Sequence, residues 1–340
     1  MNRAVASIAA CFALLFAACG GGNKDDGGAP GDPVRNVPSE NGIRDAVKAA
    51  ATPTRADFPS ANGKTLQQLA DGMAAGPSLA MASSIFTAPG ETRMAFGMIG
   101  SDGLPVYGPT AVYVAPTPDA TAEGPFVAPA DVLLTDARYR SKQAATTEDP
   151  FVAVYGAEVK FRKRGQYAVL AATKKTDGRL TGATGQVQVS SEDADPIPRV
   201  GEKAPVVHTD TVATAKGDIS KIDTRDPPSN MHDVDFADVV GKQPVALLFS
   251  TQQLCQSKVC GPVTDIELQM KSKYGDKMTF IHQEVYVDND PSKGLREPLR
   301  QFHLPSEPWL FVVDKTGRIT ARLEGSIGVQ QFEAAVKSGL

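Results

Sequence analysis

The sequence predicts two folded domains of different class: an all-β domain over residues 57–192 and an α/β domain over residues 199–340. In the first region, short apolar and aromatic runs are separated by turn residues, which is typical of antiparallel sheets. In the second, apolar strands alternate with helical segments, which is typical of a sheet covered by helices. With 340 residues, the chain is long enough to bury two cores of this size.

The chain begins with the pattern of an export signal. Arg3 precedes the apolar run Ala4–Ala18, which ends in small residues and is too short to be a spanning helix. Phe16-Ala17-Ala18-Cys19 resembles a lipobox, the motif at which bacterial lipoproteins are cleaved and acylated on cysteine. The resemblance implies a signal peptide over residues 1–18 and acyl chains, such as palmitate, on Cys19. It also implies a lipid anchor on the extracytoplasmic face of the cell membrane. The alternative is plain secretion, with no role for Cys19.

Residues 19–56 are expected to form a flexible tether. Gly20–Val37 contains almost no apolar residue, so it cannot bury a core. Residues 41–75 contain weak helical stretches, such as Thr65–Met73, that lead into the β domain.

Six runs in the β domain have the composition or the alternation of strands. Val187 and Val189 alternate with glutamines, as in a strand that is buried on one face. Gly165-Gln166-Tyr167, before an apolar strand, resembles the entry to a late strand of an immunoglobulin-like sandwich. The resemblance implies such a sandwich with a binding or spacing role. The expected strands are Arg93–Ile99, Thr110–Ala115, Phe151–Tyr155, Glu158–Arg162, Tyr167–Thr173 and Gln186–Ser190.

An acidic, proline-bearing linker, Glu192–Pro198, is expected to separate the two domains. After it the elements follow the order β-α-β-α-β-β-α, in which helices join parallel strands and the last two strands form a hairpin. The expected strands are Val245–Ser250, Met278–Val287, Trp309–Asp314 and Arg318–Glu324, and the expected helices are Thr264–Tyr274, Pro291–Phe302 and Val329–Lys337.

Four local strings in the α/β domain resemble the thioredoxin-like family. Val200–Pro205 resembles the opening of redoxin-type domains, and Cys260-Gly261-Pro262-Val263 resembles Cys-Gly-Pro-Cys with its last cysteine replaced. Ser306–Trp309 stands where the family has its cis-proline before a buried strand, and Asp314–Arg318 resembles its hairpin turn. The resemblance implies a thioredoxin-like fold for residues 199–340.

The same resemblance implies a redox site. Cys255 and Cys260 follow the first long apolar strand, which is where the family carries its redox-active cysteines. Pro308 would follow a cis peptide bond, lie against the cysteine pair and keep a backbone edge open for a substrate strand.

The two cysteines are five positions apart, in a Cys-x4-Cys spacing. On one intact helix they would be separated by about 7.5 Å along the axis, whereas a disulfide needs Cα atoms closer than about 7 Å. Because proline is accepted in the first helical turn, Pro262 predicts a helix that begins near Gly261. Cys260 then lies at the helix N-terminus and Cys255 in the preceding loop, where a bridge between them is feasible.

The sequence leaves open which thiol attacks. The helix N-terminus favours a thiolate at Cys260, with Cys255 as the resolving cysteine. In the opposite register Cys255 attacks and Cys260 resolves, which is similar to one-domain peroxiredoxins of the bacterioferritin-comigratory type. Those enzymes have a threonine where Gln252 stands, so peroxidase chemistry is not expected.

Two single positions bear on the chemistry. Leu248 falls near the place of the family's buried acid, and its apolar side chain favours a slow or specialised exchanger. Trp309, the only tryptophan, fits the core and the border of the site equally well.

Copper binding is an alternative, because copper-delivering proteins of the SCO type combine a thioredoxin fold with two cysteines and a distant histidine. His303 is the histidine that could reach the site, whereas His282 fits a core position in a strand. The remaining histidines are His208 and His232. The expected spacing in that family is Cys-x3-Cys, which this chain lacks.

We therefore expect a membrane-anchored thiol–disulfide oxidoreductase that exchanges with extracytoplasmic protein thiols or disulfides. Its catalytic residues are Cys255, Cys260 and Pro308, and neither a bound cofactor nor a metal ligand is expected. No block of Lys and Arg is interleaved with aromatic residues, which excludes nucleic acid as a partner. A binding or scaffolding lipoprotein with a structural disulfide is the other alternative. A ring this small gains little stability from closure, which favours the redox hypothesis.

Overall fold

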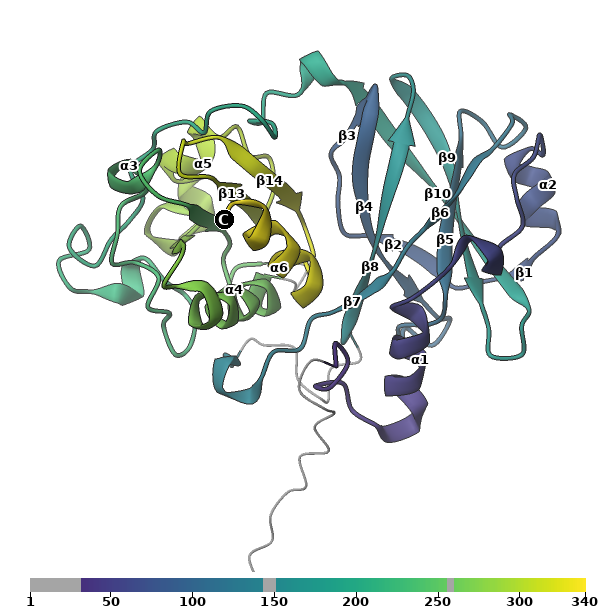
Figure 1. The fold of residues 1–340 in the computed structure, drawn as a ribbon, viewed down its shortest axis with the longest axis horizontal. Helices are drawn as coiled ribbons and strands as arrows, with labels where there is room; N and C mark the ends of the chain where they lie inside the picture. The colour runs from purple at the N-terminus through teal and green to yellow at the C-terminus, as the bar shows by residue number, and fades with distance from the viewer. Residues whose placement is uncertain (1–31, 143–150, 256–259) are drawn as a thin grey trace, which may run out of the picture.

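The computed structural model describes residues 32–142, 151–255 and 260–340, and it contains two domains that lie side by side (Figure 1). The N-terminal domain consists mainly of strands, and the C-terminal domain is built on a four-stranded sheet with helices on both faces. Within these three segments, no helix is long and apolar enough to cross a membrane. The predicted export signal and Cys19 lie outside the described residues.

The structure differs from the predicted tether over residues 32–56. This part of the chain contains a helix, α1 (Ile43–Ala50), and Val34 and Val37 are fully buried in the core of the N-terminal domain. The physical reason is the helical spacing of Ile43, Val47 and Ala50, which places them on one apolar face that packs against the domain. The folded domain therefore begins well before residue 57.

Two β-sheets pack face to face in the N-terminal domain. Buried side chains from both sheets, such as Phe96 and Val169, belong to the same core. The first sheet has the order β1-β10-β9-β5-β6 with β3 paired to β10, and the second has the order β2-β4-β8-β7. Helix α2 (Leu66–Asp71) packs on β5 and β9. The strands are β1 (Ala74–Ala75), β2 (Ser78–Met81), β3 (Phe86–Ala88), β4 (Gly90–Ile99), β5 (Thr110–Ala115), β6 (Glu123–Val127), β7 (Ala130–Val132), β8 (Ala153–Phe161), β9 (Gly165–Lys174) and β10 (Leu180–Ser191).

One predicted turn in this domain is part of a strand. Phe151–Tyr155 and Glu158–Arg162 were expected as separate strands, but β8 runs through Gly156, which pairs with Ala95 of β4. A Cβ atom at Gly156 would come within 2.5 Å of Gln331 Nε2 in the C-terminal domain. The glycine therefore marks a close approach of the second domain. The immunoglobulin-like arrangement stays a prediction.

The C-terminal domain has the predicted order of strands. β11 (Val245–Phe249) runs parallel to β12 (Thr279–Gln283), and β13 (Trp309–Val313) pairs antiparallel with both β11 and β14 (Ile319–Glu324). The resulting order is β12-β11-β13-β14, with the cysteines following a central strand. This is the strand order of a thioredoxin-like fold, as the sequence predicts.

The central strand is apolar throughout because both of its faces are covered. Val245, Leu247 and Phe249 belong to one core, and Ala246 and Leu248 belong to the core on the other face. Helices α4 (Cys260–Tyr274) and α6 (Val329–Ser338) cover the face of Leu248. Figure 1 shows α6 on the side of the domain that faces the N-terminal domain, with α4 next to it. Helices α3 (Phe236–Val239) and α5 (Glu297–Gln301) cover the opposite face.

The helix predicted over Pro291–Phe302 is replaced by two shorter pieces. A 3-10 turn occupies Pro291–Lys293, and α5 begins only at Glu297. Gly294 separates them with a φ of 80°, a conformation that interrupts a helix and that glycine adopts without strain.

The predicted linker Glu192–Pro198 is firmly packed. The Asp195 carboxylate forms a largely buried salt bridge with Arg322 of β14, with an N–O distance of 2.6 Å. Ile197 is buried in the core of the C-terminal domain. The linker therefore packs against the C-terminal domain.

Polar contacts across the interface hold the domains in one arrangement. Arg93 of β4 donates hydrogen bonds to Gln331 Oε1 (2.8 Å) and to the carbonyl oxygens of Glu324 (2.8 Å) and Ser326. Glu324 is the last residue of β14, Ser326 lies in the loop that follows, and Gln331 is in the first turn of α6.

Asp131 of β7 caps α6 from the other domain. Its carboxylate accepts hydrogen bonds from the backbone N–H groups of Gln330 (3.0 Å) and Gln331 (2.8 Å). These N–H groups would otherwise have no partner at the helix start. The position of α6 thus depends on both domains.

Candidate functional site

The cysteine pair lies at the carboxyl end of β11. Cys255 follows the strand in a loop, and Cys260 is the first residue of α4, as the position of Pro262 predicts. The Cys260 thiol is in hydrogen-bonding contact with Cys255. The strand–loop–helix junction therefore brings together two thiols that a single helix would keep apart.

The two thiols have different surroundings. Cys260 is fully buried, and this burial, followed by the contact with Cys255, raises the pKa of its thiol well above the usual value. A hydrogen bond from the Thr251 backbone N–H to its sulfur acts in the opposite direction but does not compensate. The helix N-terminus was expected to favour a thiolate at Cys260, and burial outweighs that effect. Cys255 is partly exposed, whereas Cys260 is enclosed.

Glu307 and Pro308 lie next to the pair. The Glu307–Pro308 peptide bond is cis, as predicted, and Pro308 directly precedes β13. Partial burial, and then the neighbouring Cys255, raise the pKa of the Glu307 carboxyl. The Tyr286 hydroxyl donates a hydrogen bond to Glu307 Oε1 (3.4 Å). The site thus contains a carboxyl group that gives up its proton less readily than an exposed one.

Trp309 and Leu248 are core residues. Trp309 is 1% exposed, stacks on Phe311 and donates its indole N–H to Ser306 Oγ (3.2 Å). Of the two expectations for Trp309, the core position is the one observed. Leu248 is fully buried, and a buried acid is present instead on α4, where Glu267 is fully enclosed. Among the residues that the structure describes, neither carboxylate oxygen of Glu267 has a hydrogen-bond partner.

The four histidines occupy three separate places. His208 is exposed and its Nδ1 is 2.7 Å from an oxygen of Asp235. His303 is exposed after the end of α5, where it lines a pocket distinct from the interdomain cleft beside Glu307. His232 and His282 are fully buried, and their ring centres are 5.1 Å apart.

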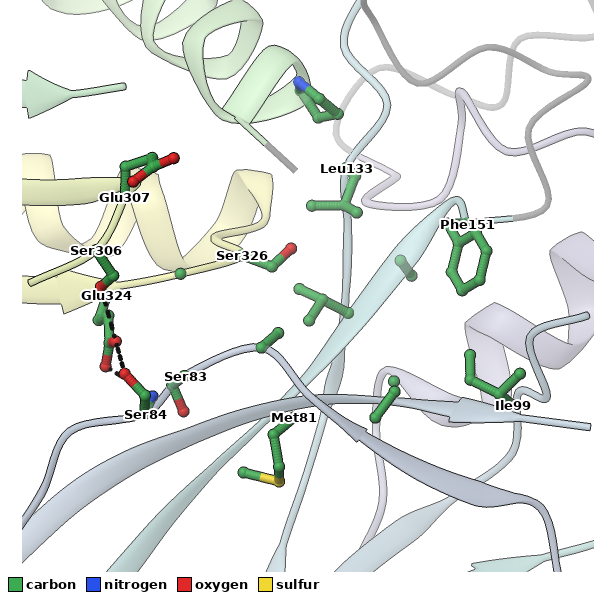
Figure 2. Close-up of a pocket in the computed structure, with 17 residues that line it drawn as sticks. Met81, Ser83, Ser84, Ile99, Leu133, Phe151, Ser306, Glu307, Glu324 and Ser326 are labelled. Atoms are coloured by element: carbon green, nitrogen blue, oxygen red, sulfur yellow. Dashed lines mark hydrogen bonds between the residues drawn. The ribbon is translucent and has the colours of Figure 1, made fainter. Parts of the chain in front are cut away.

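A cleft between the domains opens beside the cysteine pair. Its volume is about 510 Å³, and apolar side chains of the N-terminal domain, such as Met81, Leu133 and Phe151, line most of one wall. Pro262 and Glu307, which flank the cysteines in the fold, lie on the other wall. Figure 2 shows Ser306 and Glu307 on the opposite side of the cleft from Leu133 and Phe151. The cleft therefore lies close to the cysteine pair and presents an apolar surface supplied by the other domain.

The base of this cleft is held by Glu324. Its carboxylate accepts hydrogen bonds from the hydroxyl (2.6 Å) and backbone N–H (3.0 Å) of Ser84, and from the backbone N–H of Ile85 (3.0 Å) (Figure 2 draws Ser84 and Glu324). At the next residue, a Cβ atom on Gly325 would lie 1.6 Å from the carbonyl oxygen of Ala82. The two walls touch here so closely that only glycine fits.

Part of the chain resembles thioredoxin-like proteins of known structure. A putative thiol:disulfide interchange protein DsbE from Chlorobium tepidum is 17% identical with a TM-score of 0.28, and the match covers 41% of this chain and 99% of that one. A thioredoxin-family thiol:disulfide interchange protein from Chlorobium tepidum TLS is 18% identical with a TM-score of 0.27, covering 43% and 99%. A thioredoxin-like superfamily protein is 14% identical with a TM-score of 0.27, covering 32% and 85%. No protein-family model and no curated protein matches the chain. The fold assignment rests on the strand order and helix placement of the domain itself.

Sequence reasoning did not single out Glu307 and Tyr286 as site residues. Glu307 directly precedes the predicted cis-proline, and this adjacency was a usable signal. Tyr286 follows β12 in a segment outside the regular strands and helices. No alternation of polar and apolar residues there indicates where its side chain points. The pairing of His232 with His282 was equally hidden, because 50 residues separate them.

Proposed function

We propose that this chain is a thiol–disulfide oxidoreductase in which Cys255 attacks and Cys260 resolves. One observation carries the proposal: a reachable thiol is in contact with a buried, protonated thiol at a strand–helix junction, beside Pro308. A pair made only for stability would not need one accessible sulfur.

The exchange proceeds in two balanced steps. The Cys255 thiolate attacks one sulfur of a partner disulfide, the partner S–S bond breaks, and the leaving thiolate takes up a proton. Cys260 then loses its proton and attacks the Cys255 sulfur. This releases the second partner thiol and leaves a Cys255–Cys260 disulfide. The partner is reduced by two electrons and the pair is oxidised. The reverse sequence oxidises a partner dithiol.

Glu307 is the proton acceptor that this scheme needs for Cys260. Its carboxyl interacts electrostatically with both thiols. Because its pKa is raised toward neutral pH, its carboxylate is a better proton acceptor than that of an exposed glutamate. Tyr286, through its hydrogen bond to Glu307, orients the carboxyl.

We expect the exchange rate with a peptide disulfide to rise with pH through the raised pKa of Glu307. Below that pKa the carboxyl is protonated and cannot accept a proton, and above it the carboxylate can. Glu307→Gln should slow the exchange by about tenfold to a hundredfold and remove this limb of the pH profile. Glu297→Gln, on the exposed start of α5, is the matched control. Failure of the wild-type dithiol chain to react with any peptide disulfide would contradict the proposed function.

The interdomain cleft suggests the class of partner. A protein segment with apolar side chains next to its cysteine would place those side chains against Met81, Leu133 and Phe151. Burial of each apolar side chain of the partner would stabilise the complex by about 1–3 kcal/mol. The partners are therefore extracytoplasmic proteins that expose apolar, cysteine-bearing segments.

We also propose that the chain is tethered to the extracytoplasmic face of the cell membrane through acylated Cys19. The support is the lipobox-like sequence and the apolar run before it. Cys19→Ala is expected to release the chain from the membrane fraction, measured by fractionation and by the mass of the N-terminal peptide. Equal membrane retention of the variant would contradict the lipid anchor.

A further inference from the structure

Three ligand-type side chains that do not include the cysteines converge in the interior of the C-terminal domain. Asp223 and His232 lie in the long connection before α3, and His282 lies on β12. All three are fully buried or nearly so. One ligand atom of each lies within 4.8 Å of the others. The backbone N–H of His282 donates to the Met231 carbonyl (3.2 Å), which holds the connection against β12.

The distances between the ligand atoms match those around a tetrahedral cation. His232 Nε2 is 3.1 Å from Asp223 Oδ2 and 3.3 Å from His282 Nδ1, and His282 Nδ1 is 3.9 Å from Asp223 Oδ1. Four ligands held at about 2.0–2.1 Å from Zn²⁺ are separated from one another by about 3.3–3.4 Å. The observed distances run to two different oxygens of Asp223, and for one ligand atom from each residue the separations are within 4.8 Å. A single ion therefore fits between the three side chains once they move closer together.

Two of the three side chains, His282 and Asp223, have the outer contacts of metal ligands, whereas His232 Nδ1 has no hydrogen-bond partner among the described residues. His282 Nε2 is 3.0 Å from the carbonyl oxygen of Ser250, which fixes the proton on Nε2 and leaves Nδ1 as a donor of an electron pair. The Asp223 oxygens accept hydrogen bonds from the backbone N–H groups of Arg225 (2.8 Å) and Ser229 (2.7 Å). Each contact orients a ligand and leaves its inner lone pair directed at the cluster.

A further carboxyl group lies on the neighbouring helix, outside the group of three whose ligand atoms lie within 4.8 Å of one another. Glu267 of α4 is fully buried, and its two carboxylate oxygens lack a hydrogen-bond partner among the described residues. Its carboxyl interacts electrostatically with His282 and Asp223. An unpaired carboxyl in a protein interior costs stability, and coordination to a cation removes that cost.

We propose that Asp223, His232 and His282 bind a divalent transition-metal ion, with Zn²⁺ as the best fit and Glu267 as the fourth ligand. Two imidazoles with two carboxylates suit Zn²⁺, whereas Mg²⁺ and Ca²⁺ prefer oxygen ligands alone. Because the ligand residues are buried, the ion holds the structure together.

The site supports the segment that carries the cysteines. Ser250, whose carbonyl is held by His282, directly follows β11, and its hydroxyl is 2.7 Å from Thr264 Oγ1 on α4. Thr264 in turn donates to the carbonyl oxygen of Cys260 (3.0 Å). The metal site would therefore fix the base of the loop that presents Cys255.

The test is metal stoichiometry and stability of the purified full chain, which does not depend on redox activity. After loading with Zn²⁺ and desalting, we expect one equivalent of zinc per chain, measured by mass spectrometry of the metal. A strong chelator should lower the unfolding temperature of the wild-type chain, and added Zn²⁺ should restore it.

Variants locate the ion. His282→Gln and His232→Gln should weaken zinc binding by at least about a hundredfold, and Glu267→Gln by about tenfold or more. His208→Gln, at an exposed histidine, should bind one equivalent like the wild type. A Cys255→Ser/Cys260→Ser double variant should also retain the equivalent.

Two results would overturn the proposal. One is a wild-type chain that takes up no zinc and whose unfolding temperature is the same with chelator and with added Zn²⁺. In that case the cluster is a hydrogen-bonded triad without a metal. The other is loss of the zinc equivalent in the double cysteine variant, because the ion would then belong to the thiols.

Discussion

Cys255→Ser is expected to abolish thiol–disulfide exchange, lowering the rate by at least about a thousandfold, because a serine hydroxyl is not ionised at neutral pH and cannot attack a disulfide. The measurement is the rate at which the dithiol chain reduces a peptide disulfide with apolar flanking residues. Cys19→Ser is the matched control, since it removes a cysteine without touching the pair.

Cys260→Ser is expected to stop the reaction halfway. Cys255 still attacks, but the buried second thiol is missing, so a mixed disulfide between Cys255 and the peptide accumulates and is seen by mass spectrometry. The opposite result, in which Cys255→Ser traps the peptide and Cys260→Ser is inert, would show that Cys260 attacks. The order of the two roles would then be wrong.

Arg93→Ala is expected to lower the free energy of unfolding by about 3 kcal/mol. The guanidinium donates to Gln331 and to the carbonyl groups of Glu324 and Ser326, and alanine leaves these acceptors without their partner at the domain interface. Urea unfolding followed by tryptophan fluorescence measures the change, because Trp309 lies in the core of the C-terminal domain.

Arg164→Ala, in the exposed turn between β8 and β9, is the control for loss of an arginine and should change stability by less than about 0.5 kcal/mol. Equal unfolding midpoints for Arg93→Ala and the wild type would contradict the account of Arg93 as the residue that locks the domains. Other contacts would then have to hold the two walls of the cleft in place.

The sequence predicted an element best where a single physical requirement determines the residue types at its positions. Val245–Phe249 is apolar at every position because the strand is covered on both faces, and Pro262 marks a helix start because it is accepted only in the first turn. These two features, with the hairpin after Pro308, were enough to order the C-terminal elements. In the N-terminal part, Val34 and Val37 are buried by a domain surface that the local sequence, rich in glycine and charge, does not reveal.

The chemistry of the site could be predicted only in part, because it depends on burial and on distant contacts. The spacing of the cysteines predicted the junction, but only the fold shows that Cys260 is enclosed and Cys255 reachable. Glu267 follows no pattern that distinguishes it from an exposed helical glutamate, since the first turns of α4 are buried on all sides by both domains. The fit of Arg93 and Gly325 across the interface is likewise a property of two surfaces that the sequence does not place together.

The reduction potential of the Cys255–Cys260 pair tests the central claim most directly. It is measured on the purified chain by equilibrating it with glutathione redox buffers and counting alkylated thiols. A redox-active pair is expected to have a potential of about −120 to −270 mV, the range of known exchangers, and to convert reversibly between dithiol and disulfide. A potential below about −300 mV, with no mixed disulfide from Cys260→Ser, would identify a structural bridge and contradict the proposed function.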